Sequence, residues 1–138
     1  MAGETNLALM LESLSVTVRP DQYVVVTFRA GQSVPALGNG VAAVIDEHEG
    51  PTIVATVKRA AYEGWAHDFV AAWLTLDVHS ALEAVGLTAA FSRQLGREGI
   101  PCNVIAGFHH DHILVPYDRS DAAVAAIEAL AATPLPGG

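Results

Sequence analysis

The chain has 138 residues, of which 51% are hydrophobic and 16% are charged, and its formal net charge is −8. This length excludes a large multidomain enzyme, and the apolar fraction excludes a disordered chain. Seven Lys and Arg stand against fifteen Asp and Glu, which opposes the phosphate neutralisation that nucleic-acid binding requires. We therefore expect neither nucleic acid nor an anionic membrane as a partner.

Cysteine content and apolar runs bear on the compartment. The single cysteine, Cys102, cannot form an intramolecular disulfide, which fits a reducing environment. The first residues lack the basic and apolar segments of a secretory signal. The longest apolar stretch, residues 69–76, is far shorter than the roughly 20 residues that cross a bilayer. These features predict a cytoplasmic protein.

The N-terminal half is predicted to consist of short elements separated by turns. Leucine and methionine residues recur at spacings of three and four near the start, and β-branched runs follow. The expected elements are a short helix within 5–14, strand-like alternation over 13–18, a strand over 23–28, a loop over 30–40, and a hairpin of strands 41–45 and 52–57.

The C-terminal half has a sharper pattern. It predicts a strand over 69–78, a helix over 83–98, a hairpin of strands 102–108 and 112–115, and a last helix beginning near Asp118 or Ser120. The first helix buries Leu87, Phe91 and Leu95, and Gly99 is placed to end it in the left-handed conformation. The last helix carries an apolar stripe of Val124, Ile127, Leu130 and Ala131.

The order of elements from residue 69 is strand, helix, strand, strand, helix. This order predicts an α+β fold of ferredoxin-like βαββαβ type, in which helices cover one face of an antiparallel sheet. The final strand is missing after residue 132. An open sheet edge is a liability, so the missing strand must come from elsewhere, and the N-terminal 66 residues are the nearest donor.

The topology brings two loops to one pole of this sheet. The loop over 77–87 leads into a helix, and the residues His109–His112 form the hairpin turn. Backbone N–H groups at the helix start favour a carboxylate, and Gly86 would let it approach closely. Asp111 and Glu83 would then bind a cationic amine. Together these groups have the polarity that an α-amino acid requires.

Three stretches carry a resemblance to a known family: 76–90, 99–106 and 110–116. Together they resemble the ACT-domain superfamily, and within it small stand-alone proteins that carry two ACT-like units. The resemblance implies an ACT domain over 67–138 and a divergent or incomplete ACT-like unit over 1–66. It also implies side-by-side pairing of units in a homodimer, and a ligand, usually an amino acid, held at the interface by the loop after the first strand.

Carried onto this sequence, the resemblance implies one set of ligand-binding residues: His79, Ser80, Glu83, Ala84, Val85, Gly86, Leu87, Asn103 and Asp111. The implied function is a non-enzymatic regulatory protein that binds a small molecule, with an amino acid as the expected ligand and no catalytic residue or cofactor. In agreement, the sequence contains no phosphate-binding loop, dinucleotide fingerprint or nucleophile elbow.

Other functions remain open at this stage. His109, His110 and His112, with Asp111 and His79, are ligand types that Zn, Fe and Ni accept, although a polar turn uses such residues too. A metal-binding protein is therefore one alternative. A structural dimerisation module that binds no ligand is another.

Structural roles are also open for three of the proposed ligand residues. Ser80 and Glu83 have the spacing of a helix capping box. Gly86 falls inside the predicted helix, where glycine costs about 1 kcal/mol relative to alanine, so it calls for close packing or ligand approach. Asn103 starts a predicted buried strand, where either a neighbouring loop or a ligand would satisfy its amide.

Overall fold

The computed structural model describes residues 6–78 and 86–132 and divides the chain into two compact units. Unit 1 comprises Met1–Arg19 and Trp73–Gly138, and unit 2 comprises Pro20–Ala72. The chain thus begins in unit 1, passes into unit 2 and returns. This grouping differs from the division at residue 66, because residues before Pro20 pair with the C-terminal half.

The sheet of unit 1 has the strand order β1-β5-β7-β6. Its strands are β1 (Val16–Val18), β5 (Val70–Leu76, of which Trp73–Leu76 lie in unit 1), β6 (Asn103–Ala106) and β7 (Asp111–Pro116). β1 runs antiparallel to β5, with Val16 opposite Leu76. The prediction that the N-terminal part of the chain supplies the missing strand is therefore confirmed: β1 takes the place of the final strand of a βαββαβ unit.

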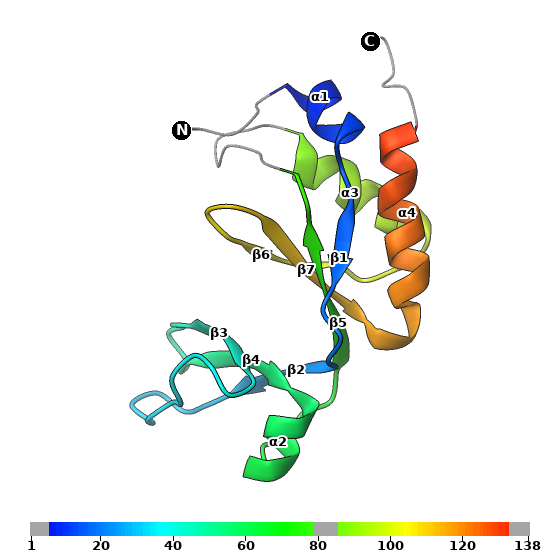
Figure 1. Ribbon diagram of the computed structural model, residues 1–138. Helices are drawn as coiled ribbons and strands as arrows, with labels where there is room; N and C mark the ends of the chain where they lie inside the picture. The colour runs from blue at the N-terminus through cyan, green and yellow to red at the C-terminus, as the bar shows by residue number, and fades with distance from the viewer. Residues whose placement is uncertain (1–5, 79–85, 133–138) are drawn as a thin grey trace. The chain divides into compact units, whose positions relative to one another are not determined.

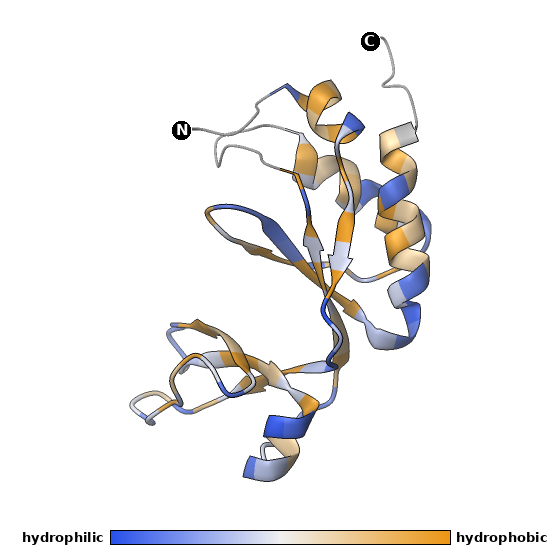
Figure 2. Ribbon diagram, in the orientation of Figure 1, coloured by the Kyte–Doolittle hydropathy of each residue, from blue (hydrophilic) through white to orange (hydrophobic). Residues whose placement is uncertain are grey.

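The helices of unit 1 are α1 (Leu7–Glu12), α3 (Leu87–Arg97) and α4 (Ser120–Ala132), and a short 3-10 turn, η1 (Tyr117–Arg119), leads into α4. α3 and α4 pack against each other on the same side of the sheet (Figure 1). Hydrophilic residues gather in the first turn of α4, and apolar residues dominate the rest (Figure 2).

The inner faces of α3 and α4 follow the predicted periodicity with one adjustment. Leu87, Phe91 and Leu95 of α3 are buried, as expected. In α4, Ile127 is buried together with Ala123 and Ala126. Val124, Leu130 and Ala131, the other members of the predicted stripe, are only half-buried. The buried face of α4 therefore includes Ile127 but is rotated slightly about the helix axis from the predicted one.

Glycine residues define both ends of α3. The helix begins at Leu87, with Gly86 as its N-cap at φ 106°, so the predicted start at residue 83 is wrong and Gly86 lies outside the helix. At the other end Gly99 has φ 68°. The Ile100 N–H donates to the Leu95 carbonyl at 3.0 Å and the Gly99 N–H donates to the Gly96 carbonyl at 3.0 Å. This is a Schellman motif, as predicted.

Unit 2 contains β2 (Tyr23–Thr27), β3 (Val41–Ile45), β4 (Thr52–Thr56), α2 (Val57–Glu63) and the first residues of β5. The strand order is β3-β4-β2-β5, and β3 and β4 form the predicted hairpin. α2 was not expected from the sequence. The Thr56 hydroxyl caps it by accepting the Arg59 N–H at 3.1 Å, and Gly64 ends it at φ 73°.

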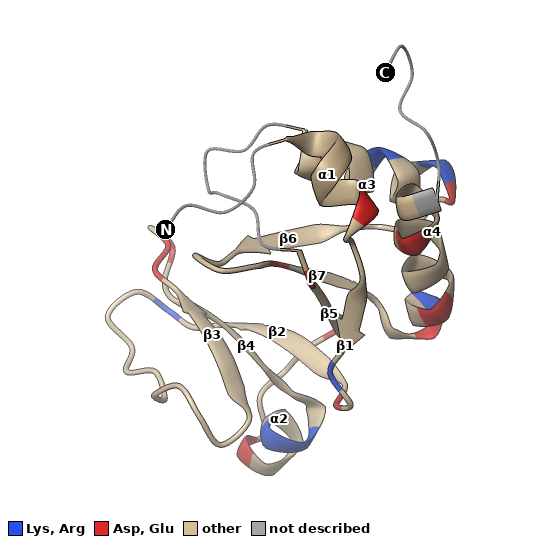
Figure 3. Ribbon diagram, turned by 45° about the horizontal axis from the view of Figure 1, so that its top comes forward, with Lys and Arg blue, Asp and Glu red and all other residues tan. Residues whose placement is uncertain are grey.

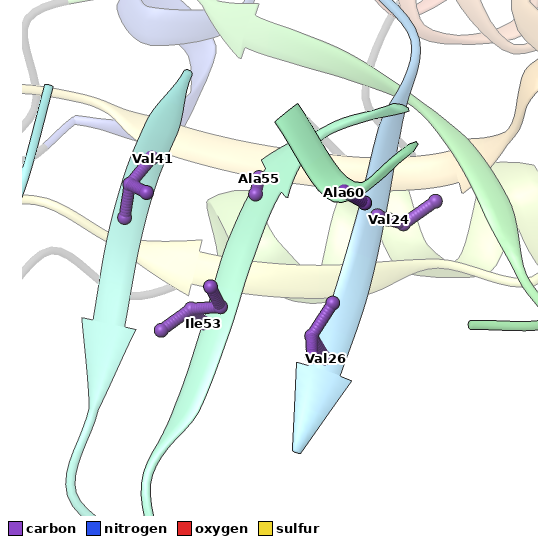
Figure 4. Close-up of a cluster of buried hydrophobic side chains, with 6 residues drawn as sticks. All are labelled: Val24, Val26, Val41, Ile53, Ala55 and Ala60. Carbon is purple, nitrogen blue, oxygen red and sulfur yellow. The ribbon is translucent and has the colours of Figure 1, made fainter. Parts of the chain in front are cut away.

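A cluster of buried aliphatic side chains forms the core of unit 2. It joins β2, β3, β4 and α2 through Val24, Val26, Val41, Ile53, Ala55 and Ala60 (Figure 4). Phe28, Val34 and Trp65 pack against this cluster and are partly buried. Phe28, just before the predicted loop 30–40, and Val34 within it therefore contribute apolar cover in unit 2.

Charged residues lie at the surface of the fold. Lys, Arg, Asp and Glu lie mainly on the helices and at the ends of strands (Figure 3). Among the residues that the structure describes, no charged side chain is buried. Within those residues, no helix is both long enough and apolar enough to cross a membrane.

Candidate functional site

The end of β5 is tied to β1 in unit 1. The Asp77 N–H donates to the Ser15 carbonyl at 2.8 Å. The hydroxyl of Thr17 donates to Oδ2 of the Asp77 side chain. This carboxylate is therefore engaged within the fold, and the chain after it enters the loop that precedes α3.

Much of that loop lies outside the described residues. His79, Ser80, Glu83, Ala84 and Val85 fall there, so their proposed ligand contacts and the capping box of Ser80 and Glu83 remain predictions. The described part of the predicted site begins at Gly86 and Leu87.

Gly86 is explained by its conformation and by a neighbour from α1. Its φ of 106° is unfavourable for residues with a Cβ. A Cβ placed there would also lie 2.9 Å from Cδ2 of Leu7. The close approach that the sequence predicted at this glycine is thus made by a side chain of the N-terminal helix. Gly86 has no side chain with which to cap the helix, so among the described residues no N-cap side chain bonds the first N–H groups of α3.

Asp111 is the first residue of β7 and lies opposite Ala106 of β6. The expectation that it belongs to the turn is wrong, because the turn is Gly107–His110, closed by the Gly107 N–H donating to the His110 carbonyl at 2.9 Å. Burial raises the pKa of the Asp111 carboxyl, and nearby His112 opposes that shift. No hydrogen bond or ion pair joins this carboxyl to another described residue.

Asn103 lies at the opposite end of the β6–β7 hairpin from Asp111. It pairs with Leu114, whereas Asp111 pairs with Ala106 at the turn. Ala106 is three positions further along β6 than Asn103, a distance of about 10 Å. Asn103 is exposed, so the prediction of a buried strand start is wrong and water can satisfy its amide. The structure does not bring Asn103 to the pole that holds Asp111.

The three histidines of the predicted turn have different surroundings. His109 is exposed in the turn, and His110 is half-buried with no described partner for its buried Nδ1. His112 is a strand residue of β7 rather than a turn residue. Its Nδ1 accepts hydrogen bonds from Nε1 of Trp73 at 3.3 Å and from the Thr75 hydroxyl at 2.9 Å.

These positions give no support to the metal alternative. Across residues 6–78 and 86–132, no group of three or more His, Cys, Asp or Glu side chains is arranged to hold a metal ion. The nitrogen of His112 that faces β5 is already hydrogen-bonded. His79, the other proposed ligand, lies outside the described residues.

Unit 2 contains an open pocket of about 440 Å³ that the sequence did not indicate. It lies where β2 and α2 begin, and its lining residues are Pro20, Asp21, Gln22, Thr56, Val57, Lys58 and Ala61. The N–H of Val57 already donates to the Gln22 carbonyl at 2.9 Å. None of the predicted ligand-binding residues lines this pocket.

Solved structures of other proteins are similar to this chain. A Vibrio cholerae protein of unknown function, described as a possible transport protein, is 37% identical over 91% of this chain and 95% of its own, with a TM-score of 0.77. A protein from Agrobacterium tumefaciens is 17% identical, covering 86% of this chain and 89% of its own, with a TM-score of 0.65.

A third similar structure is the ligand-free regulatory subunit of aspartate kinase from Thermus thermophilus. It is 10% identical, covers 83% of this chain and 95% of its own, and has a TM-score of 0.60. At this identity the likeness shows the fold alone. No curated protein matches the chain.

Two family models match the sequence, and both describe an ACT domain. One matches residues 2–72 and the other matches residues 69–129. Together they span nearly the whole chain and agree with the α+β fold of two ferredoxin-like units. Membership of this family supports a regulatory role with a small-molecule ligand. The chain belongs to the ACT-domain family and carries two matches to it.

Proposed function

We propose that this protein is a non-enzymatic regulator that binds an amino acid in unit 1, with the ligand's ammonium group on Asp111. The observation that carries the proposal is the half-buried Asp111 carboxyl, which has no partner among the described residues. Family membership and the regulatory subunit among the similar structures favour a regulatory role.

An ammonium group would relieve the cost of burying Asp111. Burial disfavours the charged carboxylate and raises its pKa. A cation within hydrogen-bond distance restores the charged form and gains a charge-assisted bond. A ligand amine is therefore a better partner for this side chain than a neutral group.

The carboxylate of the ligand would bind at the start of α3. Gly86 gives this helix no side-chain cap, and the first N–H groups of α3 lie where the helix dipole is positive and would bind the carboxylate. The proposed contacts remain His79, Ser80, Glu83, Ala84, Val85, Gly86 and Leu87. We place no contact on Asn103, because it lies at the far end of β6.

We also propose an oligomeric state and a cellular compartment for this protein. ACT units pair side by side, and we expect this chain to act as a homodimer in the cytoplasm. A dimer would leave the ligand class unchanged, because both proposed charged contacts come from one copy of unit 1.

A thermal-shift screen of the twenty amino acids tests this function. A ligand that binds only the folded state at 100 times its Kd adds about 2.7 kcal/mol to the free energy of unfolding. We expect at least one amino acid to raise the melting temperature. Its analogue without the α-amino group, and its analogue without the carboxylate, should each lose most of the shift.

Two results would contradict the proposal. No change in melting temperature with any of the twenty amino acids would favour a structural dimerisation module that binds no ligand. A full shift with the analogue that lacks the amino group would show that Asp111 does not hold the ligand's amine.

A further inference from the structure

A partly buried hydrogen-bond network joins β5 to β7 on the sheet of unit 1. The indole of Trp73 is 3% exposed and donates from Nε1 to Nδ1 of His112 at 3.3 Å. The Thr75 hydroxyl lies 2.9 Å from the same nitrogen. An indole N–H can only donate, so Nδ1 of His112 must be unprotonated and Thr75 must donate to it. The structure thus requires a neutral His112 with its proton on Nε2.

The charged neighbours of His112 reinforce this requirement. Arg19, at the end of β1, places its guanidinium carbon 4.2 Å from the centre of the Trp73 ring. The rings of His110 and His112 are 6.5 Å apart, and Asp111 is adjacent in β7. Burial lowers the pKa of His112 below its ordinary value of 6.5, Arg19 and His110 lower it further, and Asp111 opposes them. β5 contributes Trp73 and Thr75, which do not titrate in this range.

The network stands at the place where the chain leaves and re-enters unit 1. Arg19 is the last residue of unit 1 before the chain passes into unit 2, and Trp73 is the first residue after its return. The Arg19 N–H donates to the Trp73 carbonyl at 3.0 Å. Beside the β1–β5 ladder, this backbone bond and the stacking of Arg19 on the indole therefore help to hold the two passages of the chain together.

We propose that His112 is an acid-sensitive latch that holds the Arg19–Trp73 pair in place. Protonation of Nδ1 removes the acceptor of the Trp73 indole and turns Thr75 from a donor into an acceptor. It also places a positive charge beside Arg19 and His110. These changes release the indole and loosen the bond between Arg19 and Trp73, at the point where the chain passes between the units.

The direction of the pH effect follows from linkage. The folded state favours neutral His112, so the unfolded state binds more protons as the pH falls below 6.5. The stability from this group is fully present above that pH. It is lost progressively as the pH falls toward the lowered pKa of the folded state. The latch is thus closed at neutral pH and opens in mild acid.

Indole N–H signals in a two-dimensional NMR spectrum test the latch without any ligand. The full-length Trp65→Phe variant leaves Trp73 as the single tryptophan, and its indole signal is followed from pH 8 to pH 4. We expect one transition with a midpoint below 6.5. In His112→Asn the amide oxygen takes the place of Nδ1 and cannot titrate, so the transition should vanish.

Further variants keep the test decisive if His112→Asn does not fold. His110→Asn and Arg19→Gln each remove a charge that opposes protonation, so both should raise the midpoint. Asp111→Asn should lower it. Exchange protection of the Arg19 amide should fall across the same transition as the indole change.

Three results would overturn the proposal. The first is no indole transition between pH 8 and pH 4. The second is a midpoint that none of these neighbouring substitutions moves. The third is an indole transition without any loss of Arg19 amide protection, which would confine the change to the side chains and leave the chain passages fixed.

Discussion

The two units share an order of strands but differ in the segment that follows the first strand. In unit 1, β5 leads through the loop to α3, which has 11 residues and buries Leu87, Phe91 and Leu95. In unit 2, β2 leads into residues 28–40, which contain no helix. The later strands then take corresponding places, with β3-β4-β2-β5 in unit 2 and β6-β7-β5-β1 in unit 1.

The loop of unit 2 follows β2 where α3 follows β5 in unit 1, and it is fixed at both ends. At its start, the Phe28 N–H donates to the Pro51 carbonyl at 2.9 Å. At its end, Nη1 of Arg59 donates to the Asn39 carbonyl at 2.7 Å, and the Thr56 N–H donates to the Gly40 carbonyl at 2.8 Å. Phe28 and Val34 then cover the core. The same sheet order can thus be covered by anchored loop or by helix, with fewer large buried side chains in the loop.

Replacing large side chains in the two segments should reveal this difference most strongly. Phe91 of α3 is fully buried, so Phe91→Ala should lower the free energy of unfolding by about 3–5 kcal/mol. Val34 is half-buried in the loop of unit 2, so Val34→Ala should cost roughly 1 kcal/mol. Urea unfolding followed by circular dichroism measures both. Equal losses would show that the loop packs as tightly as the helix.

The start of the unit 2 loop offers the next largest effect. Gly50 has φ 137°, and a Cβ there would overlap the carbonyl oxygen of Phe28. Gly50→Ala should therefore lower the free energy of unfolding by about 3 kcal/mol or more. The alanine would have to adopt a strained positive φ, and the backbone at Phe28 would have to move away from the added Cβ. Gly38 is the matched control, because it has φ 102° and open space around the added Cβ. A loss from Gly38→Ala as large as that from Gly50→Ala would rule out the anchoring contact at Phe28.

In unit 1 the corresponding contact is between Gly86 and Leu7. Gly86→Ala should destabilise the protein by about 1–3 kcal/mol through its positive φ and the overlap with the Leu7 side chain. Leu7→Ala removes the overlap but leaves the strain at Gly86. The double variant should therefore lose roughly 0.5–1 kcal/mol less stability than the sum of the two single variants. A double-mutant cycle by chemical denaturation measures this term. Strict additivity would mean that α1 does not constrain Gly86.

Asp111→Asn should have the smallest effect on stability, and of opposite sign. The raised pKa of Asp111 means that its carboxyl favours folding in the protonated form. That stabilisation is fully present at a pH below the pKa of Asp111 in the unfolded state, and it is lost as the pH rises through the pKa of Asp111 in the folded state. At neutral pH the charged carboxylate therefore opposes folding, and Asn should raise the melting temperature of the ligand-free protein slightly. A lowered melting temperature would show that Asp111 is a structural residue.

Much of the fold was predictable because its signals are local. The periodicity of α3, the Gly99 stop and both hairpins follow from neighbouring residues. Even the missing edge strand could be assigned to the N-terminal part of the chain, since an open edge needs a partner. α2 was missed because its seven residues, with Val57 and Ala60 as inward side chains, carry too little apolar periodicity.

The site was harder to predict because it depends on contacts between distant residues. Asp111 lies next to the turn but not in it, because β7 begins one residue earlier than the predicted strand 112–115. The contact of Leu7 with Gly86 joins positions 79 residues apart, and no local pattern indicates it. The network of Trp73 with His112 likewise spans 39 positions and depends on the register of β5 beside β7.

We propose that Asp111 holds the ammonium group of an amino acid in unit 1. Calorimetric titration of the native chain and of Asp111→Asn with an amino acid found in the screen tests it most directly. Asp118→Asn is the control, because Asp118 is an exposed acid in η1. Loss of a charge-assisted hydrogen bond predicts about 10- to 150-fold weaker binding for Asp111→Asn and unchanged binding for Asp118→Asn. Equal affinity in all three proteins would show that Asp111 does not hold the ammonium group.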